Sequence, residues 1–382
     1  MPSSLVCCLP FLRKEEKSSL ATKPSSTATA SKDQSEKQTQ QSPVTPTTTI
    51  TPSSSKLTKT TTTTETAEMT ALPPHSRNVV LSGGARGVGR VVARNLLRNG
   101  HRVFLLDFDV PELEHCVSTH MPDAVEGLRD ASPPRLGSAV CDLREPDSVR
   151  AAVRAAVDFF GDGHIDVLVN NAGIARAGWT GGRTMEDPSV MDEWRAYIDT
   201  NLTGPFVLTQ SCLPYMKAEG SHPPQGPPEE SFLSPEVKDR IKQQGERDAQ
   251  LGPRQRGGCI VNISSFRATQ SQADCEGYAS TKAGLLGLNH AMAVSGARWG
   301  IRSNAILPGY IEVQHECRKG DESEMRWADT VEEERHRQHL TGRIGFGRDI
   351  SDAVEWLMGA NFVSGQEIVM DGGVSKIKHA AA

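Results

Sequence analysis

The fold of this chain is decided by residues 78–97, which read NVVLSGGARGVGRVVARNLL. The run 78–81 predicts a short buried strand, and the apolar spacing of 90–97 predicts a helix that stops at Gly100. A glycine turn, residues 82–89, connects the two. In this context glycine spacing indicates a dinucleotide site, because the backbone can approach a pyrophosphate at the positive end of the helix.

A second strand, residues 103–106, ends in Asp107, about 20 residues after the glycine turn. An acid at this distance can hold the ribose hydroxyls of adenosine. Asp107 would repel the 2′-phosphate of NADP and bind the free diol of NAD, whereas Arg86 could pair with that phosphate. Because Phe108 offers no compensating cation beside the ribose, the sequence favours NAD over NADP.

Tyr278 and Lys282 are four residues apart, so on a helix they share one face, about 6 Å apart along the axis. A phenol has a pKa of about 10 and is inactive in proton transfer near neutral pH. An ammonium at about 4 Å supplies about 4 kcal/mol at an effective dielectric near 20, enough to bring that pKa to near 7. The spacing predicts a tyrosine acid/base, although the same pair also occurs on ordinary exposed helices.

Several motifs together resemble those of the short-chain dehydrogenase/reductase family over residues 78–378. They are the glycine turn, Asn170-Asn171-Ala172-Gly173, Ser265, Tyr278, Lys282 and Pro308-Gly309. The resemblance implies an active-site tetrad of Asn201, Ser265, Tyr278 and Lys282. Tyr278 would be the general acid/base and Ser265 would orient the substrate oxygen. Lys282 would bind the nicotinamide ribose and lower the tyrosine pKa, and Asn201 would hold a water of a proton relay.

The resemblance also implies which residues contact the dinucleotide. They are Ser82, Gly83, Arg86, Gly87, Val88, Gly89, Asp107, Asp142, Leu143, Asn171, Ala172, Gly173, Tyr278, Lys282, Pro308, Gly309 and Ile311. Asp142 would contact adenine, or cap the helix from Glu145, or do both. Val313 stands where many relatives carry a threonine that anchors the cofactor. Arg267 either faces the substrate or is a solvated loop charge.

Strands and helices alternate along residues 76–378, so the predicted fold class is α/β, a single doubly wound Rossmann-type domain with a parallel sheet. Residues 1–75, rich in Ser, Thr and Pro, predict a disordered N-terminal tail. A surface insertion is expected at about 219–258, and a polar substrate lid at about 313–340. Residues 194–216 predict one long helix with a kink at Gly204-Pro205.

Composition excludes several classes of function. The net charge is −5 and no basic patch interleaves with aromatics, so no nucleic-acid partner is expected. No apolar run approaches 18 residues, so no transmembrane segment is expected. The eight cysteines form no C-x-x-C pair, which predicts no metal site and no disulfides, in a reducing, cytoplasmic compartment. Cys7-Cys8 could accept palmitate, but a sticky end of the tail is the favoured interpretation.

The predicted function is NAD(P)-dependent hydride transfer to or from a small secondary alcohol or ketone, by a homodimer or homotetramer as in relatives. A non-catalytic cofactor-binding scaffold or sensor on the same fold is the alternative, but such proteins usually lack the serine, tyrosine or lysine. An epimerase or dehydratase of the extended relatives is disfavoured by the spacing of Gly83, Gly87 and Gly89.

Overall fold

The computed structural model describes residues 76–176, 178–218, 257–331 and 333–377. The predicted tail, 1–75, and nearly all of the predicted insertion lie outside these described residues. At the centre is a parallel sheet of seven strands in the order β3-β2-β1-β4-β5-β6-β9.

The strands of this sheet are β1 (Asn78–Ser82), β2 (Arg102–Asp107), β3 (Leu136–Val140), β4 (Val167–Asn170), β5 (Cys259–Ile263), β6 (Arg302–Pro308) and β9 (Glu367–Met370). A separate parallel pair joins β7 (Ile311–Glu312) to β8 (Gly345–Phe346). Strand order reverses between β1 and β4, because β2 and β3 extend the sheet one way and β5 onward extends it the other way. In open α/β sheets, ligands bind at such a switch point, outside the carboxyl ends of the strands.

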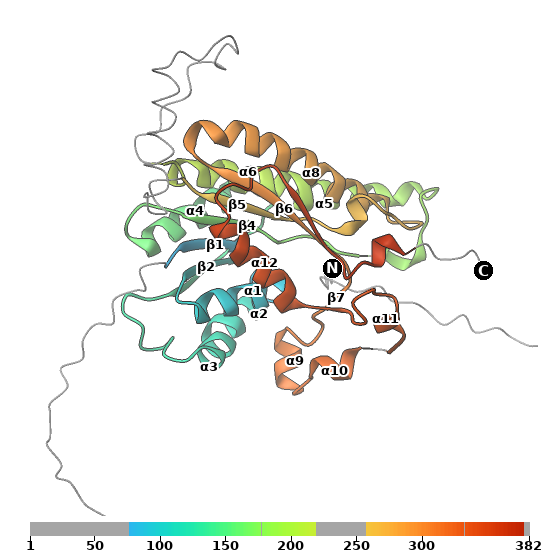
Figure 1. Ribbon diagram of the computed structural model, residues 1–382, viewed down its shortest axis with the longest axis horizontal. Coiled ribbons are helices and arrows are strands. Elements are labelled where there is room, and N and C mark those ends of the chain that lie inside the picture. Colours follow the sequence, from blue (N-terminus) through green and yellow to red (C-terminus); the bar gives the residue numbers. More distant parts are fainter. Residues whose placement is uncertain (1–75, 177, 219–256, 332, 378–382) are drawn as a thin grey trace, which may run out of the picture. The chain divides into compact units, whose positions relative to one another are not determined.

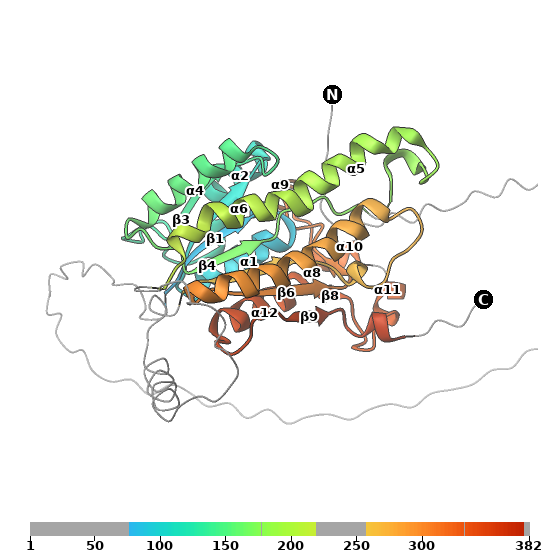
Figure 2. The same cartoon turned by 90° about the horizontal axis from the view of Figure 1, so that it is seen from above.

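Helices cover both faces of the sheet, as Figures 1 and 2 show. They are α1 (Gly87–Arg98), α2 (Val110–His115), α3 (Met121–Ala124), α4 (Pro146–Phe160), α5 (Met191–Ile198), α6 (Gly204–Cys212), α8 (Glu276–Gly296), α9 (Arg318–Glu322), α10 (Trp327–Thr330), α11 (Glu333–Arg337) and α12 (Gly347–Gly359). The helices α1 and α12 pack on one face, and α4, α6 and α8 on the other.

The central strands are apolar on both sides because each face is covered. In β1, Val79 and Leu81 belong to the core under α1 and α12, while Val80 belongs to the core under α4 and α6. This near-continuous apolar pattern is typical of parallel strands buried between two helix layers. The prediction of a doubly wound α/β domain is confirmed.

The helix predicted at 194–216 is interrupted as expected, but by a change of helix type. It starts three residues earlier, at Met191, and a π-helical turn, Asp199–Thr203, separates α5 from α6. Pro205 follows in the first turn of α6, where a residue without an N–H is tolerated. A Cβ on Gly204 would lie 2.8 Å from that of Leu143, so the close approach of the chain at this point requires glycine.

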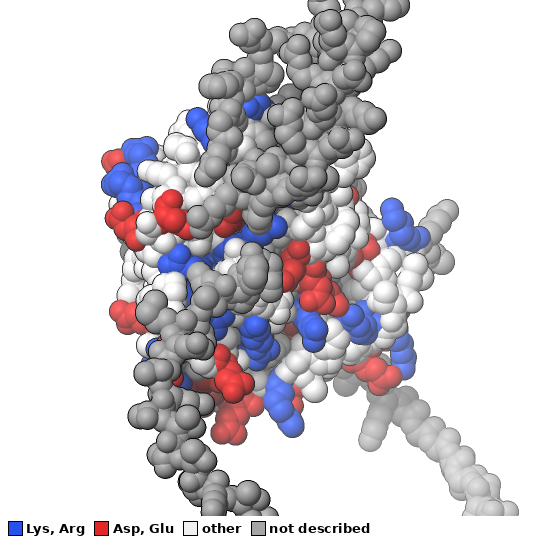
Figure 3. Space-filling model, turned by 60° about the vertical axis from the view of Figure 1, so that its left-hand side comes forward, with Lys and Arg blue, Asp and Glu red and all other residues white. Residues whose placement is uncertain are grey.

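Acidic and basic side chains are intermixed on the face shown in Figure 3. Of the helices in the described part of the chain, none is long and apolar enough to span a membrane. Six cysteines fall within the described residues, and all six are free thiols.

Candidate functional site

Two cavities open at the carboxyl edge of the sheet. The larger, about 620 Å³, is lined by Gly83, Asp107, Asp142, Leu143 and Ala172, among others. The smaller, about 140 Å³, is lined by Val88, Ser265, Tyr278, Lys282, Pro308, Gly309 and Ile311, among others. Arg86, Asn171 and Gly173 line both, so the two cavities adjoin along the switch point of the sheet.

The glycine turn fits closely against the end of β4. Gly83 has a φ of +67°, and a Cβ there would lie 2.7 Å from the Cα of Ala172. A Cβ on Gly89 would lie 2.0 Å from the Gly83 carbonyl oxygen and 2.5 Å from Asn171 Nδ2. Both positions therefore exclude any side chain, so the close packing of the turn against the end of β4 depends on glycine.

Ser82 and Asn171 brace this turn. The Ser82 hydroxyl accepts hydrogen bonds from the backbone N–H groups of Asn171 and Ala172, each at 3.2 Å. Asn171 Nδ2 in turn donates to the carbonyls of Ser82 and Gly83, at 3.1 and 2.9 Å. The Ser82 hydroxyl and the Asn171 amide nitrogen thus hold the turn in place. Any contact of these two residues with a dinucleotide has to use other atoms.

Asp107 ends β2 and is 7% exposed, with its carboxylate beside the larger cavity. It accepts hydrogen bonds from the backbone N–H groups of Ala85 and Asp109, both at 3.1 Å. Burial nevertheless raises the pKa of Asp107 above its usual value. Arg86 forms an ion pair of 3.4 Å with Asp109, and the neighbouring Phe108 is an exposed apolar side chain.

Asp142 lines the same cavity, but it does not cap the helix behind it. The N-cap of α4 is Glu145, and it makes no side-chain capping bond. The Asp142 carboxylate instead accepts hydrogen bonds from Arg144, from its backbone N–H at 3.0 Å and from its guanidinium at 2.6 Å. Hydrogen bonding from Arg144 holds the pKa of Asp142 below its usual value. The proposed capping role is wrong, because Arg144 is nearer than the helix.

Tyr278 and Lys282 lie on one face of α8, as the spacing predicts. Lys282 Nζ lies 5.7 Å from the centroid of the Tyr278 ring. The lysine is 4% exposed, and its Nζ donates to the carbonyl of Ile263 at 2.8 Å, which fixes the ammonium under the end of β5. Ser265 follows the same strand and is 5% exposed. These three predicted residues are brought together in the smaller cavity.

Asn201 lies in the π-helical turn, behind the wall of that cavity, and is 1% exposed. Its Oδ1 accepts from the backbone N–H of Ile174 at 2.7 Å, and its Nδ2 donates to the Ile174 carbonyl at 3.0 Å and to Thr281 at 3.2 Å. A Cβ on Gly173 would lie 3.0 Å from Asn201 Oδ1 and 3.5 Å from Lys282 Nζ. The side chain of Asn201 is therefore committed to Ile174 and Thr281, close to the lysine.

Gly309 closes the far wall of the smaller cavity after β6. Its N–H donates to the carbonyl of Met370 at 2.9 Å, and a Cβ would lie 2.6 Å from the Cα of Asp371. Val313, which replaces the threonine of many relatives, is 4% exposed. Its side chain packs towards Gly87, whose N–H donates to the carbonyl of Glu316 at 2.7 Å. The glycine turn is thus joined directly to the start of the predicted lid.

The sequence allows two alternative roles for Arg267 and predicts no role for Tyr310. The structure places both beside the smaller cavity, together with Arg335 from α11 and Arg176. Only its position directly after Pro308-Gly309 pointed to Tyr310. Arg267 lines the cavity and is half-buried, so the interpretation that it faces the substrate stays a prediction that its position supports.

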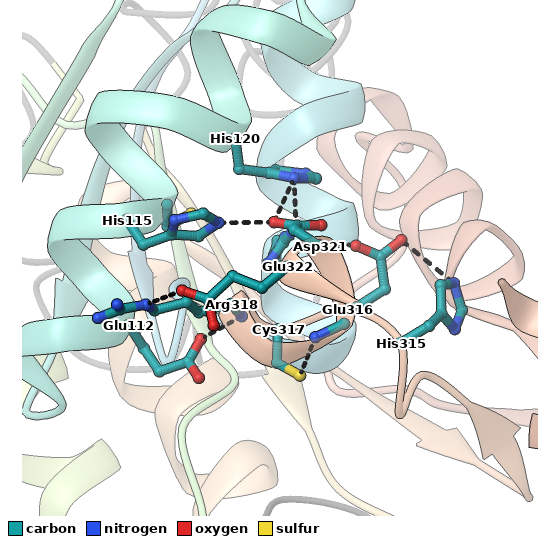
Figure 4. A network of polar contacts seen from close by, with 12 residues as sticks. Glu112, His115, His120, His315, Glu316, Cys317, Arg318, Asp321 and Glu322 are labelled. Carbon is teal, nitrogen blue, oxygen red and sulfur yellow. Dashed lines mark hydrogen bonds and ion pairs between the residues drawn. The ribbon is translucent and has the colours of Figure 1, made fainter. Parts of the chain in front are cut away.

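The root of the predicted lid is tied to α1 and α2 by a buried charge network, part of which Figure 4 shows. Arg90, 0% exposed, pairs with Asp321 of α9 and with Glu316 at 3.4 Å. Arg94 adds a 2.6 Å contact to Glu316, and His115 one of 2.8 Å to Asp321. Hydrogen bonds from Arg90 and His115 outweigh burial and hold the pKa of Asp321 below its usual value. Residues 316–322 are therefore anchored to the domain rather than loose.

Comparisons with known proteins agree with this geometry. Residues 77–222 match the family model described as short chain dehydrogenase, and residues 248–375 match the one described as Enoyl-(Acyl carrier protein) reductase. A ketoacyl reductase of the granaticin polyketide synthase from Streptomyces violaceoruber is 30% identical over 81% of this chain and 97% of its own length.

Two further proteins extend the comparison. Cis-4-hydroxycyclohexanecarboxylate dehydrogenase from Sinomonas cyclohexanicum is 29% identical over 79% of this chain and 97% of its own length. The crystal structure of levodione reductase superposes with a TM-score of 0.57 at 27% identity, covering 79% of this chain and 98% of that one.

Proposed function

Because the chain belongs to the short-chain dehydrogenase family and is an NAD(P)-binding oxidoreductase, we propose that it interconverts a secondary alcohol and a ketone, with Tyr278 as the acid/base. The observation that carries this proposal is the grouping of Ser265, Tyr278 and Lys282 in one cavity, which Arg86 and Val88 of the glycine turn also line. Two similar proteins support a secondary alcohol or ketone as the substrate class. One is named as a ketoacyl reductase and the other as a hydroxycyclohexanecarboxylate dehydrogenase.

The residues at the switch point fit a nicotinamide dinucleotide. Gly83 and Gly89 leave no room for a Cβ, so glycine allows the tight turn that leads into the positive N-terminus of α1, where dinucleotide folds bind the pyrophosphate. Asp107 would receive the adenosine ribose, and Asp142 and Leu143 would border the adenine. Lys282 would hold the nicotinamide ribose, with the backbone of Pro308, Gly309 and Ile311 along the ring.

When bound there, the dinucleotide supplies or accepts a hydride, and the protein handles the proton. In the reducing direction, the carbonyl carbon of the ketone takes up the hydride and its oxygen takes up a proton, which gives the alcohol. The Tyr278 hydroxyl donates the proton to the substrate oxygen, and the Ser265 hydroxyl holds that oxygen in place. Lys282 stabilises the phenolate that is left, and Asn201 keeps the segment after Gly173 in position through Ile174.

We propose NAD rather than NADP as the preferred cofactor. A 2′-phosphate would lie against the Asp107 carboxylate, and that repulsion would need a close cation. Arg86 is the nearest candidate in the turn, but it is paired with Asp109 at 3.4 Å. The exposed neighbour Phe108 supplies no charge.

Substitution of the acid/base residue tests the proposal. Tyr278→Phe should lower turnover of ketones by at least about 100-fold, because general acid catalysis contributes about 10²–10⁴-fold. NADH binding, followed by nicotinamide fluorescence, should remain within a few-fold of the parent protein. Phe362→Tyr, at an exposed position after α12, is a control that exchanges the same two residue types outside both cavities. Turnover by Tyr278→Phe above about a tenth of the parent rate would reject the assigned role.

A homodimer or homotetramer is part of the proposal. The helices α6 and α8 carry the exposed apolar residues Phe206 and Val294, which supports assembly through these helices. Light scattering on the purified protein decides between monomer and oligomer. The cytoplasmic location remains a prediction from cysteine usage.

A further inference from the structure

Arg267 is held in a fixed position beside the proposed reacting centre. Its backbone N–H donates to the hydroxyl of Ser265 at 3.1 Å. Its guanidinium carbon lies 4.7 Å from the ring centroid of Phe266 and 5.7 Å from that of Tyr310. Its Nη2 donates to the Tyr310 hydroxyl at 2.8 Å and to Gln272 Oε1 at 2.5 Å. Two aromatic faces and two hydrogen bonds therefore orient this cation before any ligand arrives.

The charge of Arg267 is not neutralised by the part of the chain that the structure describes. Its partners there, Phe266, Tyr310 and Gln272, are all neutral. The two other arginines at the junction of the cavities differ, because Arg176 pairs with Glu193 at 3.0 Å and Arg86 with Asp109 at 3.4 Å.

The cavity has little negative charge of its own to oppose this cation. The carboxylate among its lining residues, Glu312, is 2% exposed and accepts a hydrogen bond from the backbone N–H of Gln314 at 2.9 Å. Lys282 and Arg335 are two further cations among the lining residues, beside Arg86 and Arg176. An anion entering this space would therefore meet a net attractive field in a setting of reduced dielectric.

We propose that the substrate carries a carboxylate near its reacting carbon, and that Arg267 binds it. A guanidinium offers a planar fork of donors that matches a carboxylate, and its two aromatic walls strengthen the contact by excluding water. Tyr310 accepts from Arg267, so its own O–H proton is left to donate to the same carboxylate. The structure thus assigns Arg267 and Tyr310 as the residues that select an acidic substrate.

The position of the carboxylate rests on the proposed function, which puts the reacting oxygen on Ser265. Ser265 and Arg267 are two residues apart and line the same cavity, whose volume is only about 140 Å³. A cavity of this size suits a substrate with only a few bonds between its carbonyl carbon and its carboxylate. Arg267 could instead have only a structural role, joining Tyr310 to Gln272 by hydrogen bonds. The experiment separates this structural role from carboxylate binding.

The test compares an acidic ketone with its neutral ester, using 4-oxocyclohexanecarboxylate and its methyl ester with NADH. The parent enzyme should reduce the acid with a kcat/KM at least about tenfold above that of the ester, as one charge-assisted contact allows. Arg267→Gln keeps a polar side chain but no charge. It should lower kcat/KM for the acid at least about tenfold, mainly through KM, and leave the ester within about twofold.

Two further variants control for structure. Arg267→Lys should restore part of the preference, because it restores the charge without the planar fork. Arg298→Gln removes an arginine whose Nε donates to the Ser295 carbonyl at 3.0 Å on the surface, and should change neither substrate. Equal efficiency on acid and ester in the parent enzyme, or an equal loss of both in Arg267→Gln, overturns the proposal.

A binding measurement keeps this proposal distinct from the proposed reaction. Calorimetric titration of the enzyme–NADH complex should detect cyclohexanecarboxylate but not cyclohexanecarboxamide, and Arg267→Gln should lose that binding. Tyr278→Phe should keep it even though its turnover is lost. If the parent protein reduces neither ketone, the reaction is in doubt but this titration still decides the carboxylate site. Undetectable carboxylate binding, or binding unchanged in Arg267→Gln, overturns it.

Discussion

Replacing Arg90 by methionine should destabilise the domain by releasing the root of the lid from α1. Arg90 is 0% exposed and is shared by two carboxylates, Asp321 and Glu316. Methionine is similar in length and fills most of the same space, so the main loss is the positive charge. After the change, Glu316 keeps Arg94 at 2.6 Å and Asp321 keeps His115 at 2.8 Å.

The size of the effect follows from how buried these carboxylates are. Removing one partner of a buried ion pair costs about 3–5 kcal/mol. The side chain of Asp321 is 31% exposed and that of Glu316 is 8% exposed, and both keep a partner, so we take the lower end, about 3 kcal/mol. At about 2–4 °C for each kcal/mol, the midpoint of thermal unfolding should fall by about 6–12 °C.

His120 provides a second test of this prediction, through the pH dependence of the stability of the protein. Burial and then the charge of Arg90 lower the pKa of His120 from 6.5 to about 4. Since the unfolded chain binds this proton more readily, His120 makes the parent protein lose stability as pH falls from 6.5 towards 4. Asp321 and Glu316, which act to raise this pKa, and Arg94, which lowers it, all remain in the variant. Without Arg90 the pKa rises towards 6.5, so this acid-induced loss shrinks by about 1.4 kcal/mol for each pKa unit.

Thermal unfolding followed by circular dichroism, without cofactor, at about pH 7.5 and about pH 5.5 measures both effects. Arg98→Met is the matched control on the same helix, because Arg98 is exposed and its guanidinium donates to the Ala124 carbonyl at 2.9 Å. The control should keep the parent midpoint. An Arg90→Met protein that unfolds at the parent temperature, or whose deficit is the same at both pH values, would refute the reasoning.

Three further predictions concern the dinucleotide. Asp107→Ala should shift the ratio of kcat/KM for NADH over NADPH at least about tenfold towards NADPH, and an unchanged ratio would reject the ribose contact. Because burial raises the pKa of Asp107 above 3.8, fluorescence titrations should show NADH affinity declining at a higher pH than for an exposed aspartate. The Asp107→Ala protein should lack that decline. Gly89→Ala should abolish NADH binding, since its Cβ would meet the Gly83 carbonyl oxygen at 2.0 Å. Gly287→Ala, in open space on α8, should bind normally, and equal binding by both variants would contradict the close-packing argument.

Much of the fold could be predicted because the central strands have a recognisable local sequence pattern. Residues 78–81 and 165–169 are continuous apolar runs, and a parallel sheet covered on both faces needs that pattern. The grouping of Ser265, Tyr278 and Lys282 was also predictable, because residues at the carboxyl ends of parallel strands or on the next helix meet at one edge. Their roles in catalysis stay predictions.

Other features had no local signal. The pairing of Arg90 with Asp321 joins positions 231 residues apart, and neither residue differs in sequence from an ordinary surface charge. Gly204-Pro205 predicted a kink but not a π-helical turn, because that depends on how closely α6 approaches Leu143. The predicted helix cap by Asp142 was wrong because the nearby Arg144 binds the same carboxylate. Residue propensities do not say which of two possible donors a carboxylate binds.

The hydrogen bond from Gly87 to the Glu316 carbonyl has a consequence for how the binding of the two reactants is coupled. Any movement of the glycine turn is coupled to the residues around Glu316, because their side chains are also held to α1 through Arg90 and Arg94. Linkage of this kind is reciprocal, so whatever tightens one partner tightens the other by the same factor. The nucleotide and the substrate should accordingly each raise the affinity for the other by one common factor, which calorimetric titration of each reactant with and without the other measures.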